Sequence, residues 1–486
     1  MTTDVLVVGA GPVGLTTAIS LARRGVACRI VDRRPEPRPG TRACTVWQRT
    51  LEVFRLLGLP MDAYLAAGSR YVHRTYHVTG FPPFTHDMSE PSSTYPAALV
   101  IGQQETERVL TERLAGLGIA VERGWTAVGI EQGVSGVRTE LAGQAGRRQV
   151  ESAYVVAAEG PHSTIRSLLG IPFPAKHFPG TQLLQVDARV TGLPGDPAHC
   201  HMFLGERGSL GTAPLPDGRV RLYAGVVDSG LTSDPSTGEL RAAVEAVTGQ
   251  TGIDLSDARF AWRVRLRNSV AETFRAGRCF LAGDTAHTVM PVTAQGMNTG
   301  VQDAFNLGWK LAEAVQGRAG EVLLDSYHAE RHPVALALVA HTERAYWGGA
   351  GPVPDFARIY ERLHHISSAH TGIPLSYRDH GNAVPGLAAG DRAPDGPIHT
   401  VRGQRIRLYD HLDTGDWTLL GIGSPPPRLG GVRTIGVHPD GEVVDTDGSL
   451  RDAYGQGLFL VRPDGYLGCV GDRPEVFSRY LKDIRG

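Results

Sequence analysis

Three glycines near the amino terminus have the spacing that a dinucleotide phosphate requires. Gly9, Gly11 and Gly14 form the pattern G-x-G-x-x-G, and Asp32 ends the next apolar run. In this motif the first glycine permits a tight turn, the second lets the backbone approach a pyrophosphate, and the third lets a helix pack closely on a strand. Asp32 can accept hydrogen bonds from both ribose hydroxyls, and its charge repels a 2′-phosphate. The residues predict a dinucleotide site that disfavours NADP.

Two predicted strands and the helix between them would position these residues. Residues 5–8 and 27–31 are short apolar runs typical of buried parallel strands, and the apolar positions between them have helical spacing. The helix would begin at the glycine turn, where its free N–H groups and dipole favour phosphate. This complete strand–turn–helix–strand context argues against a turn without a ligand, but it does not separate FAD from NAD.

A second candidate segment, GDTAHTVMPVTAQGMNTGVQDAFNLGWKLA, spans residues 283–312. Asp284 follows a short apolar run, and a carboxylate at the end of such a strand faces the ligand crevice of an open α/β sheet. Beyond Pro291 and Gly296 the chain is predicted to enter a helix with a capping box of Thr299 and Gln302. The apolar face of that helix comprises Val301, Ala304, Phe305, Gly308, Leu311 and Ala312.

This second helix start suggests which dinucleotide is bound. Backbone N–H groups there would stabilise the negative charge of a reduced isoalloxazine without a lysine, and Asp284 would hold the ribityl chain. A long cofactor that is bound both by an early turn and by a late loop indicates FAD. A nicotinamide cofactor does not require a second helix start at its ring end.

Composition excludes several other classes of protein. The 486 residues carry a formal net charge of −1, which gives no reason to expect nucleic acid. The five cysteines are dispersed without a CxxC pair, so we expect reduced thiols in the cytoplasm and neither disulfides nor zinc. No run of ~18 apolar residues predicts a membrane span. His364, His365 and His370 lack metal-site spacing, and His287 is expected to be a hydrogen-bonded loop residue.

Along the rest of the chain the pattern changes twice, first in the spacing of apolar residues and then in composition. Between residues 170 and 279 apolar residues alternate, as in half-buried antiparallel strands. One of these strands carries Arg263, Arg265 and Arg267 on a single face, which is more typical of a solvated face than of an anion site. From about residue 374 a Gly- and Pro-rich linker leads to a final α/β region with strands near residues 417–421 and 458–461.

Three motifs together resemble a known family. GAGPVG with Asp32, EGPHSTIR and the segment from Gly283 are similar to the single-component FAD-dependent aromatic hydroxylases, which include p-hydroxybenzoate and phenol hydroxylases. The order of motifs is closest to that of the polyketide-tailoring hydroxylases. The resemblance implies an α/β fold: a Rossmann-like FAD-binding domain, an inserted antiparallel substrate sheet that covers the flavin, and a thioredoxin-like carboxyl-terminal domain without redox chemistry.

The resemblance also implies domain boundaries. Residues 1–170 would form the first part of the FAD-binding domain, with an excursion near 71–98 into the substrate domain. Residues 171–275 would form the substrate sheet, 276–373 the second FAD-binding part, and 374–486 the linker and last domain.

Site residues follow from the same resemblance. The expected FAD contacts are Gly9, Gly11, Gly14, Asp32, Arg33, Arg42, Gln103, Asp284, Pro291, Gly296, Met297 and Asn298. The expected substrate contacts are Trp47, Phe203, Tyr223 and Met290. No metal ligand and no catalytic side chain are predicted, because the cofactor carries the chemistry. The family usually has aspartate where this chain has Glu159. The longer side chain puts in question how tightly the reduced nicotinamide is bound.

The implied function is an FAD-dependent monooxygenase. Tightly but non-covalently bound FAD would be reduced by transient NADPH or NADH, and O₂ would form a C4a-hydroperoxide that hydroxylates a phenolic or polyketide substrate. Baeyer–Villiger insertion and epoxidation stay open. A flavin halogenase should show a WxWxIP stretch, which is absent from the sequence. A FAD-containing binding or assembly protein is the alternative of another class. We expect a monomer or homodimer.

Overall fold

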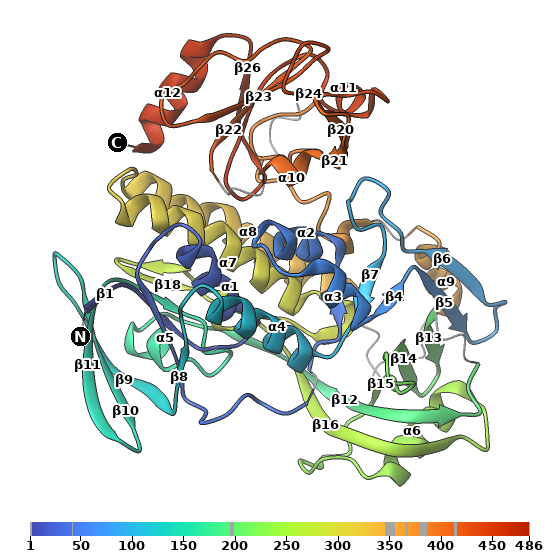
Figure 1. Cartoon of the computed structure of the whole chain (residues 1–486). Coiled ribbons are helices and arrows are strands. Elements are labelled where there is room, and N and C mark those ends of the chain that lie inside the picture. Colours follow the sequence, from blue (N-terminus) through green and yellow to red (C-terminus); the bar gives the residue numbers. More distant parts are fainter. Residues whose placement is uncertain are drawn as a thin grey trace.

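The computed structural model describes residues 2–40, 42–194, 199–345, 355–365, 368–378, 386–412 and 416–485. Its layers are seen in Figure 1: the FAD-binding sheet and its helices, the middle sheet beside them, and the carboxyl-terminal domain against α7 and α8. The fold class agrees with the predicted one. No helix in the described part of the chain is long and apolar enough to cross a bilayer.

The first sheet has the strand order β17-β18-β11-β1-β2-β8, with β9 and β10 attached to β11. Its strands are β1 (Thr2–Val8), β2 (Cys28–Asp32), β8 (Val121–Arg123), β9 (Trp125–Gln132), β10 (Val137–Gly143), β11 (Gly146–Ala157), β17 (Arg275–Ala276) and β18 (Cys279–Leu281). β1 pairs in parallel with β2 and β11, and β11 pairs in parallel with β18. The carboxyl ends of strands that are distant in sequence therefore meet at one edge of the sheet.

Helices pack on this sheet and bury its apolar residues. They are α1 (Pro12–Ala22), α2 (Gln48–Leu56), α3 (Met61–Ala66), α4 (Gln103–Ala115), α5 (Thr164–Leu168), α7 (Gly296–Val315) and α8 (Glu321–Ala345), with the 3₁₀ turns η1 (Gly283–Thr285) and η2 (Pro291–Thr293). The predicted apolar face of α7 is buried, as expected. The predicted capping box is wrong, because α7 begins at Gly296 and so Thr299 lies inside its first turn.

The middle sheet has the order β19-β16-β12-β15-β14-β13-β5-β6. Its elements are β5 (His73–Val78), β6 (Phe84–Asp87), β12 (Ala175–Thr191), β13 (His199–Gly205), β14 (Gly208–Pro214), β15 (Val220–Val227), β16 (Asp254–Val270) and β19 (His287–Thr288), with helix α6 (Thr237–Thr248). Strands β5 and β6 come from the predicted 71–98 excursion. The predicted alternation holds, since Leu184, Val186 and Leu222 form a core against α6. The domain boundaries themselves stay predictions.

A small sheet of β3 (Thr45–Val46), β7 (Ala98–Val100) and β4 (Ser69–Tyr71) lies between these two layers. After α9 (Phe356–Leu363) and η3 (Ser368–Thr371) comes the carboxyl-terminal domain. Its elements are β20 (Pro397–Thr400), β21 (Arg405–Arg407), α10 (Leu408–Leu412), β22 (Thr418–Ile422), β23 (Arg433–Val437), β24 (Val443–Val444), α11 (Ser449–Tyr454), β25 (Gly457–Val461), β26 (Leu467–Gly471) and α12 (Pro474–Arg485). The two strands predicted here correspond to β22 and β25.

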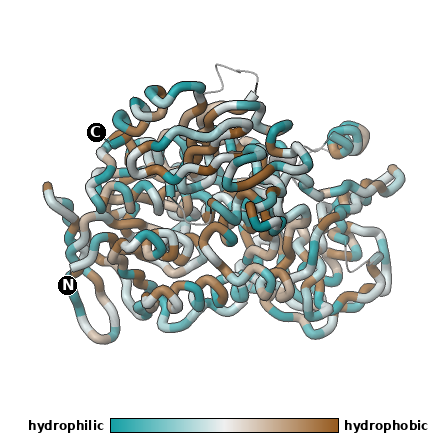
Figure 2. Tube along the Cα trace, turned by 45° about the horizontal axis from the view of Figure 1, so that its top comes forward, coloured by the Kyte–Doolittle hydropathy of each residue, from teal (hydrophilic) through white to brown (hydrophobic). Residues whose placement is uncertain are grey.

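Hydrophobic segments concentrate towards the middle of the molecule, and hydrophilic ones are frequent on outer helices and loops (Figure 2). One continuous core joins β1, α1 and α7 to residues of the carboxyl-terminal sheet. All five cysteines are buried and unlinked, as predicted.

Candidate functional site

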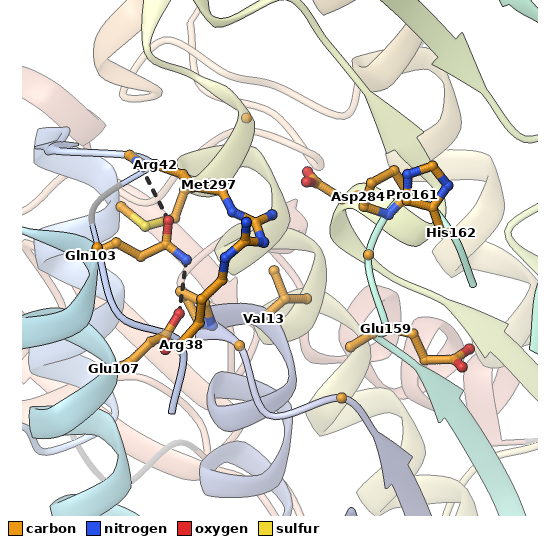
Figure 3. Close-up of a pocket in the computed structure, with 18 of the residues that line it drawn as sticks. Val13, Arg38, Arg42, Gln103, Glu107, Glu159, Pro161, His162, Asp284 and Met297 are labelled. Atoms are coloured by element: carbon orange, nitrogen blue, oxygen red, sulfur yellow. Dashed lines mark hydrogen bonds between the residues drawn. The ribbon is translucent and has the colours of Figure 1, made fainter. Parts of the chain in front are cut away.

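A cavity of about 700 Å³ opens where β1, β2 and β18 end (Figure 3). Most of the predicted cofactor residues line it: Gly9, Gly11, Asp32, Arg33, Arg42, Gln103, Asp284, Pro291, Gly296 and Met297. Segments that are far apart in the sequence thus form one wall around a single space. Gly14 and Asn298 do not line it but support the residues that do.

The glycine turn has the geometry that its motif predicts. Gly9 has φ +106°, and a Cβ there would lie 2.2 Å from the Ala158 carbonyl oxygen. A Cβ on Gly14 would lie 1.8 Å from the Gly9 carbonyl oxygen, so close packing requires glycine at both positions. A Cβ on Gly11 would meet no atom within 4 Å and would project into free space beside the helix start. This hollow fits the phosphates of a dinucleotide.

The start of α1 is prepared for an anion. No side chain caps this helix at Gly11, so its first N–H groups stay available. Asp32 accepts hydrogen bonds from the backbone of Ala10 (2.8 Å) and Arg34 (2.8 Å), one at each carboxylate oxygen. These bonds fix the carboxylate, and its remaining lone pairs can accept ribose hydroxyls.

Gln103 and Arg42 lie together on one side of the cavity, across from Asp284 and Glu159 (Figure 3). The Gln103 amide accepts a hydrogen bond from the Ala43 backbone (3.2 Å) and donates one to Glu107 (2.8 Å). Burial raises the pKa of Glu107, although Gln103 and Arg42 both oppose this rise. The sequence prediction missed Glu107, yet its place one helical turn after Gln103 was a usable signal.

Asp284 projects into the cavity from η1, directly after β18. Burial raises the pKa of its carboxyl group, while His287 and Arg42 lower it. No hydrogen bond to this carboxylate is found within the described ranges, which leaves its oxygens available to ligand hydroxyls. A polyhydroxylated chain such as the ribityl group of FAD fits that requirement.

Asn298 supports the loop that precedes α7, residues 291–295, which is called the ring-side loop below. Its side chain accepts from the Trp47 backbone N–H (2.8 Å) and donates to the Thr45 (2.9 Å) and Ala294 (2.9 Å) carbonyls. The Trp47 indole donates to the same Ala294 carbonyl (3.1 Å). Ala294 has φ +54°, a left-handed conformation that costs free energy for a residue with a Cβ. These contacts stabilise the turn that presents Gly296 and Met297 to the cavity.

A buried carboxylate, Asp303, joins that loop to α7 and α8. It accepts from the Gly283 backbone (3.2 Å), His287 Nε2 (2.6 Å) and Arg331 Nε (2.6 Å). His287 is therefore hydrogen-bonded, as predicted, but it lies in the short strand β19 and not in a loop. Arg331 and His287 hold the pKa of Asp303 at about 2, against the effect of burial.

Glu159, the departure from the family pattern, caps a helix. Its carboxylate accepts from the Ser163 hydroxyl and from the Thr164 (3.3 Å) and Ile165 (3.1 Å) backbone at the start of α5. Figure 3 shows this side chain directed away from Asp284. The carboxylate end of the side chain is thus bound to the start of α5, while Glu159 and Gly160 both still line the cavity.

The four predicted substrate residues lie in different places. Tyr223 lines the cavity, together with Gln185, Arg221 and Trp262 of the middle sheet. Trp47 and Met290 are buried behind the ring-side loop, with exposed fractions of 1% each. Phe203 belongs to the core beneath α6, where it stacks on His77 with ring centroids 4.3 Å apart. The sequence prediction missed Trp262, which Arg38 covers at 5.0 Å.

Residues 2–342 match a family model described as "FAD binding domain". The chain belongs to this FAD-binding family. It is 33% identical to a flavin-dependent monooxygenase of Mycobacteroides abscessus, with 99% of each chain covered. It is 34% identical to a 6-methylpretetramide 4-monooxygenase of Streptomyces rimosus over 97% of this chain and 91% of the relative.

A solved structure agrees: the anhydrotetracycline hydroxylase OxyS of Streptomyces rimosus has a TM-score of 0.81 and 30% identity, with 100% of this chain and 98% of that chain covered. The protein is thus an FAD-dependent monooxygenase with aromatic hydroxylases as relatives, and NAD(P)H reduces the cofactor in this family. When bound, FAD activates O₂. The chain's own residues would hold the phosphates at Gly11, the hydroxyls at Asp32 and Asp284, and the ring beside Met297. We find no metal-ligand cluster among the described residues.

Proposed function

We propose that this monooxygenase hydroxylates a phenolic, polycyclic aromatic compound of the polyketide type. One observation carries the proposal: the cavity is continuous from the cofactor residues to the face of the middle sheet that bears Gln185, Tyr223 and Trp262. A flat aromatic substrate held there would lie between that sheet and the ring-side loop. Relatives named for 6-methylpretetramide and anhydrotetracycline support a fused-ring substrate.

Oxygen transfer, in contrast to simple oxidation of NAD(P)H, requires a site that excludes water, because water would release the reactive oxygen as peroxide. The middle sheet and the loop that precedes α7 both contribute residues to the lining of the cavity. Baeyer–Villiger insertion is the second candidate reaction, since the same cavity would admit a cyclic ketone.

The test uses purified, yellow holoenzyme with a panel of hydroxyanthraquinones and NADPH or NADH. The expected result is oxidation of the nicotinamide that the aromatic compound stimulates, with one O₂ consumed per NAD(P)H. Under ¹⁸O₂ the product should carry one labelled oxygen on a ring carbon, and label in a new ester would instead identify Baeyer–Villiger insertion. A reaction with H₂O₂ and no enzyme is the control. If every aromatic compound yields only H₂O₂, the proposal is wrong.

We also propose that the protein works in the cytoplasm as a monomer or homodimer. The five unlinked, buried thiols support a reducing compartment. The carboxyl-terminal domain docks on its own chain through the ion pair of Arg392 with Glu52 (2.6 Å), which supports a complete site within one chain. Light scattering of the holoenzyme measures the oligomeric state, and a larger assembly would contradict this part.

A further inference from the structure

A glutamine of the middle sheet faces the cavity between two aromatic side chains. Gln185 lies in β12, and its cross-strand partners are Tyr223 of β15 and Trp262 of β16. Directly opposite residues of antiparallel strands project from the same face of a sheet, with their Cβ atoms about 4.5–5.5 Å apart. All three residues line the cavity, so one row across three strands presents an amide between two rings to the ligand.

The side chain of Gln185 has no partner within the described part of the chain. The residue is only 8% exposed, yet its amide makes no hydrogen bond with any residue of the described ranges. Gln103, elsewhere on the cavity wall, differs, because its amide accepts from the Ala43 backbone N–H (3.2 Å) and donates to Glu107 (2.8 Å). Buried polar groups in folded proteins are almost always hydrogen-bonded, so the Gln185 amide marks a place where a ligand atom belongs.

The neighbouring indole also lacks an acceptor. The Nε1 atom of Trp262 is buried and makes no hydrogen bond within the part of the chain that the structure describes. An indole N–H can only donate a hydrogen bond, and an amide NH₂ group offers two donors. Adjacent residues of one row therefore carry uncharged donors without acceptors. A carbonyl oxygen complements them, because it is uncharged and has two lone pairs.

This row lies on the part of the sheet that meets the ring-side loop. Leu183, Tyr223 and Val264 pack with Val292 in one apolar cluster. Val292 belongs to the ring-side loop, and Leu183 shares the strand face of Gln185 because it precedes it by two residues. A ligand whose oxygen is bound at Gln185 would therefore lie beside the expected position of the flavin ring, and not at the adenine end of the cavity.

An arginine of the same wall is paired within the protein. Arg221 lines the cavity, but it forms a two-point ion pair with Asp187, with Nη2 and Oδ2 2.9 Å apart. The carboxylate of Asp187 thus compensates this charge. Gln185 carries neither a charge nor a partner, and an amide binds an uncharged oxygen without the cost of desolvating an ion. The wall at Gln185 is therefore suited to a neutral group of the ligand.

We propose that Gln185 is a specificity-determining residue that donates a hydrogen bond to a ketone or quinone oxygen of the substrate, with the Trp262 N–H as a second donor. This inference rests on the proposed function and names its substrate class: fused-ring phenols that also carry a ring carbonyl. The hydrogen bond fixes the orientation of the fused rings. It thereby selects the ring carbon that faces the flavin.

The experiment compares two flat phenols that differ in one carbonyl group, 2-hydroxyfluoren-9-one and 2-hydroxyfluorene. Each is titrated into oxidised holoenzyme at about pH 6.5, where both phenols are un-ionised, and binding is measured by calorimetry. Wild-type enzyme should bind the ketone about 10-fold more tightly. Gln185→Met removes the amide at similar volume, so it should abolish this preference and change binding of hydroxyfluorene by less than about threefold. Gln149→Met, on an exposed glutamine of β11, is the matched control and should change neither.

Infrared spectroscopy supplies a readout that a merely structural role of Gln185 would not move. The ketone is labelled with ¹³C at its carbonyl carbon, so that the difference between labelled and unlabelled spectra isolates this band from protein and flavin bands. On wild-type enzyme the carbonyl stretch should lie below its frequency in hexane, because a hydrogen bond weakens the C=O bond. Gln185→Met and Trp262→Phe, which retains an aromatic ring, should each return the band towards the hexane value.

Three results bear directly on the proposal. Wild-type enzyme that binds both probes equally overturns it, as does equal weakening of both probes by Gln185→Met. If Gln185→Met loses its FAD, the wild-type spectrum decides, since a carbonyl band at the hexane frequency also overturns the proposal. Failure of every aromatic compound to stimulate NAD(P)H oxidation would refute the proposed function alone, because these measurements use oxidised enzyme without a reductant.

Discussion

Two carboxylates near the cofactor loops, Asp284 and Glu159, show how the surroundings of a residue assign its role. Asp284 has no described hydrogen-bond partner, and burial raises its pKa. Burial also raises the pKa of Glu159, but three hydrogen bonds from the start of α5 occupy its oxygens. Both residues line the cavity, but the oxygens of Asp284 are available to a ligand, whereas those of Glu159 are bound to α5.

Asp284→Ala should therefore weaken FAD binding by about 10-fold to 100-fold, the loss expected for a hydrogen bond to a charged group. Wild-type affinity should fall as the pH decreases through the raised pKa of Asp284, at a higher pH than for an ordinary aspartate, and the variant should lack this dependence. Fluorescence of released FAD measures both effects.

Glu159→Gln is the matched control for that experiment. It removes the charge that caps α5, so the free energy of unfolding should fall by about 1 kcal/mol. FAD affinity should change by less than about threefold. A loss of affinity equal to that of Asp284→Ala would show that Glu159 contacts the cofactor after all.

At the scale of elements, the start of α7 depends on residues that do not touch the cavity. Asn298 and Trp47 both hold the carbonyl of Ala294, the residue with left-handed backbone before the helix. The Asn298 side chain thus has a supporting role that the motif alone could not reveal, and the predicted cofactor contact at Asn298 stays a prediction.

Asn298→Ala should remove the acceptor of the Trp47 N–H and the donor to the Thr45 carbonyl, and leave the Ala294 carbonyl with the Trp47 indole alone. The expected cost is about 2 kcal/mol or more of stability, with a shifted flavin absorbance band because the ring-side loop relaxes. Chemical denaturation and the holoenzyme spectrum measure the two effects. Gln316→Ala, at the exposed far end of the same helix, should alter neither, and an unshifted spectrum in Asn298→Ala would contradict the assigned role.

At the scale of the whole molecule, buried ion pairs hold the carboxyl-terminal domain on α7 and α8. Glu330 accepts from Arg462 (2.7 Å) and Lys310 (2.8 Å), and Asp464 accepts from the Trp309 indole (2.9 Å). Burial lowers the pKa of Lys310 to about 8, although Glu330 opposes this shift. The domain is therefore part of the scaffold that fixes α7, in keeping with a structural role for a thioredoxin-like tail.

The lowered pKa of Lys310 predicts a pH dependence of stability. Between about pH 8 and its ordinary value of 10.5, the unfolded chain binds a proton that the folded chain has lost. Unfolding free energy must then rise with pH relative to a variant without the amine, by up to about 3 kcal/mol across that window. Denaturation of wild type and Lys310→Met at pH 7.5 and pH 10 measures this, and parallel pH profiles would contradict it.

Much of the cofactor site was predictable because its signals are local. The glycine turn, Asp32 and the segment after Gly283 each combine residue type with short-range spacing, and backbone geometry converts such spacing into structure. The substrate residues were less predictable: of four aromatic and methionine candidates, only Tyr223 lines the cavity. Strand periodicity shows which residues share a face but not which sheet or helix will cover that face.

The amino-acid sequence by itself determined the fold class and the family, and it predicted the two ends of the candidate FAD site, because each depends on patterns within a few dozen residues. Only the tertiary structure decided that Glu159 caps α5 and that Asn298 supports a turn. Those assignments depend on hydrogen bonds and charges between residues far apart in the chain, and such contacts exist only once the sheets have packed together.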